Sequence, residues 1–292
     1  MADRMDSEKE WKLSIRKFSI KPEHRKGHKE ILDKLTGLVL GAIKNNLPNE
    51  RFGILFSGGV DSTLIAQVCK KEKKDFICYT SALEEKGLKE AEDLEYAKKA
   101  AKKFGFKLKV KTIGLKETEK YIKKILKIIK EPNVVKVGVA LPFYIAYELA
   151  KKDKIRIMFS GLGSEELFAG YQRHLLSKDI NKECFDGLLN MYERDLTRDL
   201  PIAKAMKIDL RVPYLDENLI KYSLKIPAEF KLKNEQNKLI LREVAEQLGL
   251  KEFAWRKKRA AQYGSKFDRA IEKLAKRNGF KYKKDYLKSL LI

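Results

Sequence analysis

The chain of 292 residues is 43% hydrophobic and 10% aromatic, which is enough apolar material for a buried core and argues against a disordered protein. It has no run of 18 apolar residues and its first thirty residues are charged throughout, so we expect neither a membrane span nor a secretory signal. Three cysteines without a Cys-x-x-Cys pair argue against a disulfide framework or a structural zinc site. Together these features predict a cytoplasmic protein.

The formal net charge of +23 admits more than one interpretation. The surplus is mostly lysine and is spread over predicted helical segments, as in Lys98-Lys99 and Lys123-Lys124. This distribution favours solvated helix faces. A nucleic-acid partner is an alternative that the charge leaves open but its spread does not favour, and attraction of anionic ATP is a third.

Residues 1–30 are predicted to form an N-terminal extension, and residues 31–292 a single domain. The extension holds apolar residues in a stretch that is amphipathic as a helix, namely Trp11, Ile15 and Phe18. A first helix of the domain is predicted from about residue 30 to residue 45.

Strands and helices then alternate along the chain. Short apolar runs predict strands at residues 52–56, 76–80 and 155–159, and alternation of lysines with apolar residues predicts a strand at residues 107–110. Apolar residues at helical spacing predict helices at residues 62–73, 90–104, 116–130 and 141–151. This order predicts an α/β fold with a parallel, twisted sheet that helices cover on both faces. After Glu165 the strand signals fade, so the C-terminal part is predicted to be mainly helical.

A glycine turn lies between the first predicted strand and its helix, with the sequence Ser57-Gly58-Gly59-Val60-Asp61-Ser62. Glycines let the backbone wrap closely round a phosphate, and the following helix points its free N–H groups at the anion. Asp61 would repel a bare phosphate, which indicates a bridging Mg²⁺. A Gly-Gly turn alone favours the alternative, a plain turn with an Asp or Ser cap on the next helix. The six residues together, directly after an apolar strand, favour a phosphate loop without the lysine of a Walker motif.

A second turn repeats this pattern, with the sequence Ser160-Gly161-Leu162-Gly163-Ser164-Glu165-Glu166. It also follows an apolar strand and opens a predicted helix. If the two strands are neighbours, Asp61 and Glu165 face one metal ion from opposite sides. The alternative is that Glu165 and Glu166 only favour a helix N-terminus electrostatically.

Several motifs in order resemble the synthetase domain of glutamine-dependent asparagine synthetases, which are PP-loop ATP pyrophosphatases. The likeness extends from about residue 35 to residue 275. Its motifs are the two turns, Glu131-Pro132, Ala169-Gly170-Tyr171, Arg211-Val212-Pro213-Tyr214-Leu215-Asp216, Lys238 with Leu241-Arg242, and Arg256-Lys257-Lys258. The resemblance implies an adenine nucleotide alpha hydrolase-like fold and ATP with Mg²⁺ as reactants.

The resemblance also implies roles for individual residues. The predicted ATP-binding residues are Leu55 and Gly161 near the adenosine, Ser160 beside them, and Ser57, Gly58, Gly59, Asp61 and Ser62 at the phosphates. Asp61 and Glu165 are the predicted Mg²⁺ ligands. The predicted catalytic residues are Glu165 and Lys258, with the lysine stabilising the transition state or the pyrophosphate. The alternative for Lys258 is one lysine among many in a loosely aligned segment.

Three departures from the family pattern bear on the reaction. The chain has Ala2 where a glutaminase domain would carry its cysteine nucleophile, so ammonia is expected to be free or delivered by a separate glutaminase subunit. Leu162 stands where asparagine synthetases carry a glutamate between the two glycines, and Glu165 replaces an aspartate. The variant turn, together with residues 258–260 and 262–265, resembles the asparagine-synthetase-domain-containing group.

These features predict an ATP-dependent carboxylate–amine ligase that forms an acyl-adenylate, by default β-aspartyl-AMP, and amidates it with ammonia. Two alternatives stay open. A PP-loop tRNA-modifying enzyme would suit the basic charge, although no Cys-x-x-Cys or RNA-binding appendage is present. A non-catalytic nucleotide-binding subunit would suit Leu162, although Asp61 and Glu165 are retained.

Overall fold

The computed structural model describes residues 7–22, 27–256 and 259–291. Its centre is a five-stranded sheet in the order β3-β2-β1-β4-β5, in which every neighbouring pair is parallel. The strands are β1 (Phe52–Leu55), β2 (Phe76–Leu83), β3 (Leu108–Ile113), β4 (Ile157–Phe159) and β5 (Asp209–Arg211). Strand β1 is central, with Phe52 paired to Phe76 of β2 and Gly53 paired to Met158 of β4. The predicted parallel sheet is therefore confirmed.

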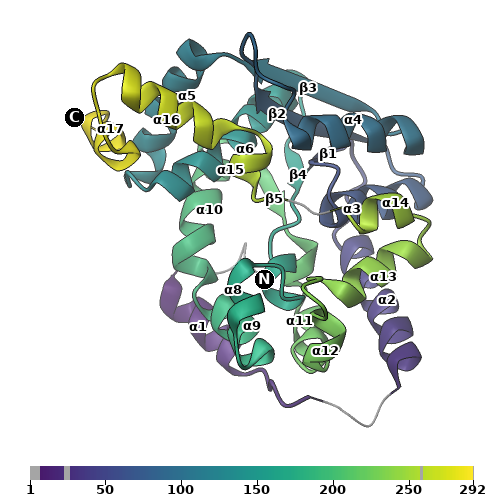
Figure 1. Ribbon diagram of the computed structural model, residues 1–292. Helices are drawn as coiled ribbons and strands as arrows, with labels where there is room; N and C mark the ends of the chain where they lie inside the picture. Colours follow the sequence, from purple (N-terminus) through teal and green to yellow (C-terminus); the bar gives the residue numbers. More distant parts are fainter. Residues whose placement is uncertain (1–6, 23–26, 257–258, 292) are drawn as a thin grey trace.

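Helices surround this sheet (Figure 1). Those that follow the first strands are α3 (Val60–Lys71), α4 (Glu92–Phe104), α5 (Leu115–Ile129) and α6 (Val134–Lys152), and α2 (His28–Lys44) precedes β1. Every residue of β1 and all eight residues of β2 are buried, because helices cover both faces of these strands. The predicted α/β fold is confirmed.

The part of the chain after β4 is mainly helical, as predicted, and it packs around the sheet. Its helices are α7 (Ser164–Leu167), α8 (Gln172–Leu176), α9 (Ile180–Leu189), the π-helical turn η2 (Tyr192–Leu196), α10 (Thr197–Met206), the 3₁₀ turn η3 (Pro213–Leu215), α11 (Glu217–Ser223), α12 (Ala228–Lys231), α13 (Leu239–Gln247), α14 (Lys251–Ala254), α15 (Ala261–Gly264), α16 (Phe267–Arg277) and α17 (Lys283–Ser289).

Two predictions of local structure were wrong. The expectation that strand signals end before residue 165 missed β5, because that strand has three residues of which two are charged, and it forms an edge of the sheet. The helix expected from residue 141 begins at Val134, where the Asn133 side chain accepts the amides of Val135 and Lys136. Pro142 lies inside this helix rather than at its start.

The N-terminal stretch also contributes to the core. Helix α1 (Glu8–Arg16) buries Trp11 and Ile15, and the Trp11 indole donates a hydrogen bond of 2.6 Å to the carbonyl of Leu188. The domain boundary at residue 30 stays a prediction.

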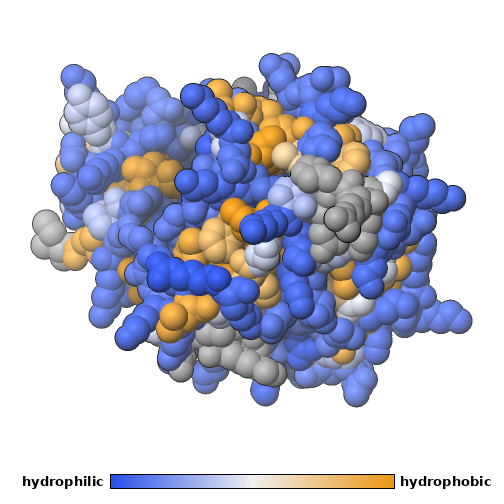
Figure 2. Space-filling model, turned by 90° about the horizontal axis from the view of Figure 1, so that it is seen from below, coloured by the Kyte–Doolittle hydropathy of each residue, from blue (hydrophilic) through white to orange (hydrophobic). Residues whose placement is uncertain are grey.

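The surface is dominated by hydrophilic side chains with hydrophobic patches between them, as one face shows (Figure 2). All three cysteines are free and buried. Within the described ranges no single helix is long and apolar enough to cross a membrane; the bent pair α5 and α6 meets that test only when both helices are taken together.

Candidate functional site

The two glycine turns meet at the carboxyl ends of β1 and β4, which are adjacent strands. A Cβ atom built on Gly161 would lie only 2.9 Å from the Cβ of Asp61, so the second turn can approach the first only with glycine at this position. Both turns line one cavity of about 1590 Å³. An open parallel sheet binds ligands at this edge, in the crevice beyond the strand ends.

Most of the predicted site residues lie together in this cavity. Its lining includes Leu55, Ser57, Asp61, Ser62, Ser160, Gly161 and Glu165. Gly58 and Gly59 are buried and shape the first turn instead of lining the cavity. The predicted catalytic Lys258 lies outside the described residues. On either side of that gap, Arg256 reaches the first turn and Arg259 lines the cavity.

The first turn is held in shape by its own hydrogen bonds. The amide of Ser57 donates to the Ser62 hydroxyl oxygen at 3.3 Å, and that hydroxyl donates to the carbonyl of Gly59 at 3.3 Å. Gly58 has a φ of +66°, and a Cβ there would collide with the backbone of Tyr96 at 2.5 Å. Helix α3 then begins after Gly59, which offers no side-chain cap, and the first amides of any helix lack an intrahelical carbonyl to bond. This is the arrangement that binds phosphate at helix N-termini.

Arg256 supports this turn from behind. Its guanidinium donates to the carbonyl of Ser57 at 2.7 Å and to a carboxylate oxygen of Asp93 at 2.7 Å. It also lies 4.0 Å from the centre of the Tyr96 ring. Because Arg256 is buried and contacts the turn through a backbone carbonyl, it positions the loop.

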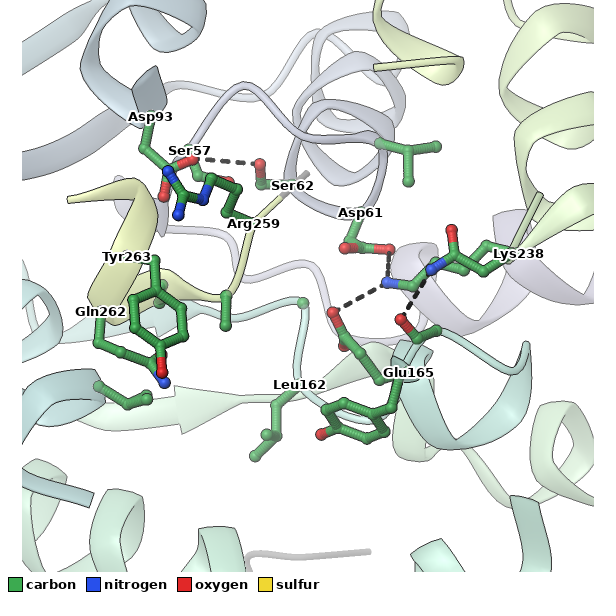
Figure 3. A pocket seen from close by; sticks show the side chains of 18 of the residues that line it. Ser57, Asp61, Ser62, Asp93, Leu162, Glu165, Lys238, Arg259, Gln262 and Tyr263 are labelled. Carbon is green, nitrogen blue, oxygen red and sulfur yellow. Dashed lines mark hydrogen bonds and ion pairs between the residues drawn. The ribbon is translucent and has the colours of Figure 1, made fainter. Parts of the chain in front are cut away.

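Lys238 lies between the carboxylates of the two turns (Figure 3). Its Nζ atom is 2.8 Å from Asp61 Oδ1 and 3.0 Å from Glu165 Oε1, and it donates to the Ser164 hydroxyl oxygen at 2.9 Å. Asp61 is 2% exposed and Lys238 is 4% exposed. A buried carboxylate needs such a partner, since an unpaired charge inside a protein is costly. The lysine thus joins the two turns electrostatically.

The backbone holds Lys238 in this position. The residue has a φ of +56°, and its amide donates to the carbonyl of Phe168 at 3.0 Å, which ties it to the end of α7. The partner of Lys238 is also held, because the Tyr214 hydroxyl donates a hydrogen bond of 3.1 Å to the backbone carbonyl of Asp61.

The donor set at this position fits a magnesium ion that shares its ligands with a nucleotide. Mg²⁺ is usually bound by one or two carboxylates together with substrate phosphates and water. Asp61 and Glu165 supply two carboxylates, each with one oxygen on the Lys238 ammonium. Among the described residues, no group of three or more His, Cys, Asp or Glu side chains could hold a metal by itself. The role of Asp61 and Glu165 as ligands stays a prediction.

A chain of charged side chains lies behind the second turn. Glu166 is fully buried and is paired with Arg194, and it accepts a hydrogen bond of 2.8 Å from the Tyr171 hydroxyl. Arg194 also pairs with Asp195, which pairs with Arg198. Burial, together with the negative charge of Asp195, raises the pKa of Glu166 to about 7. Glu166 therefore serves the structure of the turn and does not face the cavity as a ligand.

Several known proteins have sequences similar to that of this chain. A model of the asparagine synthase family matches residues 35–184 and 176–285. The chain belongs to the asparagine synthase family. It is 34% identical over 294 residues to a putative glutamine-hydrolyzing asparagine synthetase 1 of Methanocaldococcus jannaschii, a match that covers 88% of this chain and 53% of that protein.

Vertebrate relatives match this asparagine synthase family member in the same way. The glutamine-hydrolyzing asparagine synthetase of Gallus gallus is 30% identical, over 76% of this chain and 41% of its own length. That of Homo sapiens is 28% identical, over 80% of this chain and 43% of its own length. The chain spans about half the length, or less, of these curated relatives.

Solved structures give weaker likenesses. The NH3-dependent NAD synthetase of Campylobacter jejuni aligns with a TM-score of 0.42 at 15% identity, over 91% of this chain and 94% of that one. The NMN synthetase of Francisella tularensis gives 0.42 at 12% identity, over 90% and 94%. The fold of this family member is therefore established by its own strand order.

Two residues of the site were not predicted to act there. Lys238 was visible only as part of a Lys-x-x-Leu-Arg motif, and Arg256 only as part of a basic segment. Both reach the turns through contacts that span more than 170 residues of sequence, which no local pattern reports.

Proposed function

We propose that this chain is an ATP-dependent carboxylate–amine ligase that activates a carboxylate as an acyl-adenylate and converts it into an amide with ammonia. The proposal rests on one observation: the two glycine turns meet at the carboxyl ends of β1 and β4, where Lys238 contacts both Asp61 and Glu165. Membership of the asparagine synthase family supports the same chemistry and makes aspartate the reference acceptor.

The residues divide the work in this proposal. The uncapped amides of α3 and the hydroxyls of Ser57 and Ser62 bind the two terminal phosphates of ATP. Lys238 offers positive charge where pyrophosphate leaves, and Lys258 is the second predicted cation there. A magnesium ion held by Asp61 and Glu165 would neutralise charge on the triphosphate.

The reaction balances without a further reactant. A carboxylate oxygen of the acceptor bonds to the α-phosphorus of ATP while the bond from that phosphorus to the bridging oxygen breaks, and pyrophosphate leaves. Ammonia then bonds to the acyl carbon, AMP leaves, and one proton is released. In this proposal ammonia is the amine that the acyl-adenylate accepts.

Product analysis with Mg-ATP, ammonium and a panel of carboxylic acids tests the proposal. We expect AMP and pyrophosphate in equal amounts, and the amide of whichever acid is accepted. Formation of ADP in place of AMP would contradict the adenylation mechanism.

A nucleic-acid acceptor is a second candidate, motivated by the net charge of +23. It requires that tRNA stimulates AMP release and that binding weakens steeply with salt. Release of AMP that is indifferent to tRNA would remove this candidate and leave the first in place.

A further inference from the structure

The cavity extends well beyond the two turns. Its outer part is lined by the first half of α6, by α8, by the junction of η2 with α10, and by the turn at residues 232–236. Leu162 lies at the border of the two parts, between Gln262 and Glu165 in the view of Figure 3. The whole cavity, at about 1590 Å³, exceeds the ~300–1,000 Å³ typical of a site for one small ligand. There is room for ATP and for a sizeable acceptor.

The charged side chains that line the outer part are already neutralised within the protein. Each buried or half-buried cation has its own carboxylate at 2.6 or 2.7 Å: Lys136 with Glu131, Arg173 with Glu183, Arg194 with Asp195, and Arg198 with Asp199. In the described lining of this part, the charges outside such pairs are Lys233 and Glu235, which are exposed on the rim.

This pairing matters for the acceptor. Free aspartate carries an ammonium group and a second carboxylate beside the one that reacts, and both lose hydration on entering a cavity. A site for it needs unpaired groups of opposite charge on the wall to replace that hydration. Apart from Lys233 and Glu235, which are exposed to solvent, the charges that line the outer part already have partners within the protein.

The same part of the cavity is rich in apolar surface. Leu162, Val139, Phe143 and Leu175 line it and are half-buried. Eight large hydrophobic side chains are exposed in the described part of the chain, and four of them line this one cavity, namely Val135, Leu176, Trp255 and Tyr263. Exposed apolar side chains that gather round a hollow mark a binding surface, whereas single ones scattered over a protein do not.

We infer that the acceptor of this site is a carboxylic acid with an uncharged, apolar body larger than aspartate, aliphatic or aromatic, which lies along Leu162, Phe143 and Leu176. The inference rests on the proposed function, since it names the acid that the site adenylates. The reacting carboxylate faces the two glycine turns, and the apolar body occupies the outer part of the cavity.

Exchange of labelled pyrophosphate into ATP tests the inference, because it reports adenylation without the amination step. The probes are straight-chain carboxylic acids from butanoate to decanoate, 4-phenylbutanoate, aspartate and glutamate. We expect kcat/KM to rise with chain length, and aspartate to be at least about tenfold poorer than the best acid. Exchange that is best with aspartate would overturn the inference and leave the proposed ligase standing. Mg-ATP binding without exchange for any acid would count against the proposed function itself.

Two exposed leucines, one that lines the cavity and one outside it, distinguish a loss of acid binding from a general effect of an added surface charge. Leu176 in α8 is 81% exposed and lines the cavity, whereas Leu13 in α1 is 58% exposed and does not. We expect Leu176→Glu to raise the KM for the longest accepted acid roughly tenfold with the KM for ATP unchanged, and Leu13→Glu to change neither. Equal KM values for the acid in both variants would overturn the inference.

Discussion

The two glycine turns start from the same pattern of strand, glycines, acid and helix, yet they are supported in different ways. The first turn closes on itself through Ser57 and Ser62, is backed by Arg256, and opens the 12-residue helix α3. The second opens α7, which has only four residues, and is backed by the buried charges around Glu166. Under the proposed function, the first turn presents backbone amides to the phosphates of ATP, and the second sets side chains at the border between ATP and the acceptor. A shared local pattern therefore does not imply a shared task.

The largest effect is expected from removing the link between the turns. Lys238→Met removes the ammonium that contacts both Asp61 and Glu165, and breaking a buried pair costs about 3–5 kcal/mol of stability. We expect a matching fall in the free energy of unfolding, measured with urea, and loss of adenylation. Lys17→Met removes an exposed pair with Glu217 and is the control, and we expect it to leave the free energy of unfolding nearly unchanged because exposed pairs contribute little. Similar losses in both variants would mean that Lys238 does not join the turns.

The next effect compares the acids of the two turns. We expect Asp61→Asn to lower the kcat of adenylation by about 10²–10³, as removal of a preorganised electrostatic group does at other sites. Glu165→Gln is expected to cost less, because its side chain is more exposed than that of Asp61. Circular dichroism checks that both variants fold, and Asp75→Asn at an exposed pair is the control. Full adenylation activity of Asp61→Asn would contradict the proposed role of this carboxylate in the reaction.

Buried ionisable side chains next to the second turn make the free energy of unfolding of the protein depend on pH. His174 is buried, and its Nδ1 accepts the amide of Tyr171 at 3.0 Å. Burial, aided by the charge of Arg173, lowers its pKa from 6.5 to about 4. The unfolded chain therefore takes up the proton first, and stability falls as pH falls from about 7 towards 4. We expect the contribution of His174 to drop by about 2 kcal/mol between pH 7.5 and pH 5.

Denaturation of wild type and His174→Gln at several pH values isolates that contribution. Glu166 acts in the opposite sense, because its raised pKa favours the protonated form in the folded protein, so its contribution is lost as pH rises from about 4.5 through 7. Glu166 is present in both wild type and His174→Gln, so its contribution cancels in the difference between their free energies of unfolding. A difference that is constant with pH would contradict the low pKa of His174.

The smallest effect is expected behind the first turn. Arg256→Lys keeps the charge but cannot contact Ser57 and Asp93 with one planar group. We expect the KM for ATP to rise roughly tenfold, with kcat changed less, because the loop is displaced and no reacting group is lost. A fall in kcat at constant KM would instead place Arg256 in contact with the reacting atoms.

The sequence allowed the sheet and the turns to be predicted because both are local features. Three apolar runs located β1, β2 and β4, an alternating stretch located β3, and glycines next to serines located the turns. Strand β5 could not be predicted, since Asp209 and Arg211 take strand form only through pairing with β4. The position of Lys238 could not be predicted either, because it depends on a left-handed residue tied to Phe168 and on a carboxylate 177 residues away. Long-range contacts of this kind are set by the packed fold.

The bond between Lys238 and Asp61 also constrains when the site can form. A ribosome delivers β1 and its turn early, but the lysine that neutralises Asp61 and the arginine that supports Ser57 arrive some 180 to 200 residues later. Contacts of such high sequence separation carry the loop-closure entropy of the intervening chain and are expected late in folding. Nascent chains that stop short of residue 238 therefore hold the turn at the end of β1 without its ion pair to Lys238. Under the proposed function, nucleotide binding is expected to appear only in the final, cooperative step of folding.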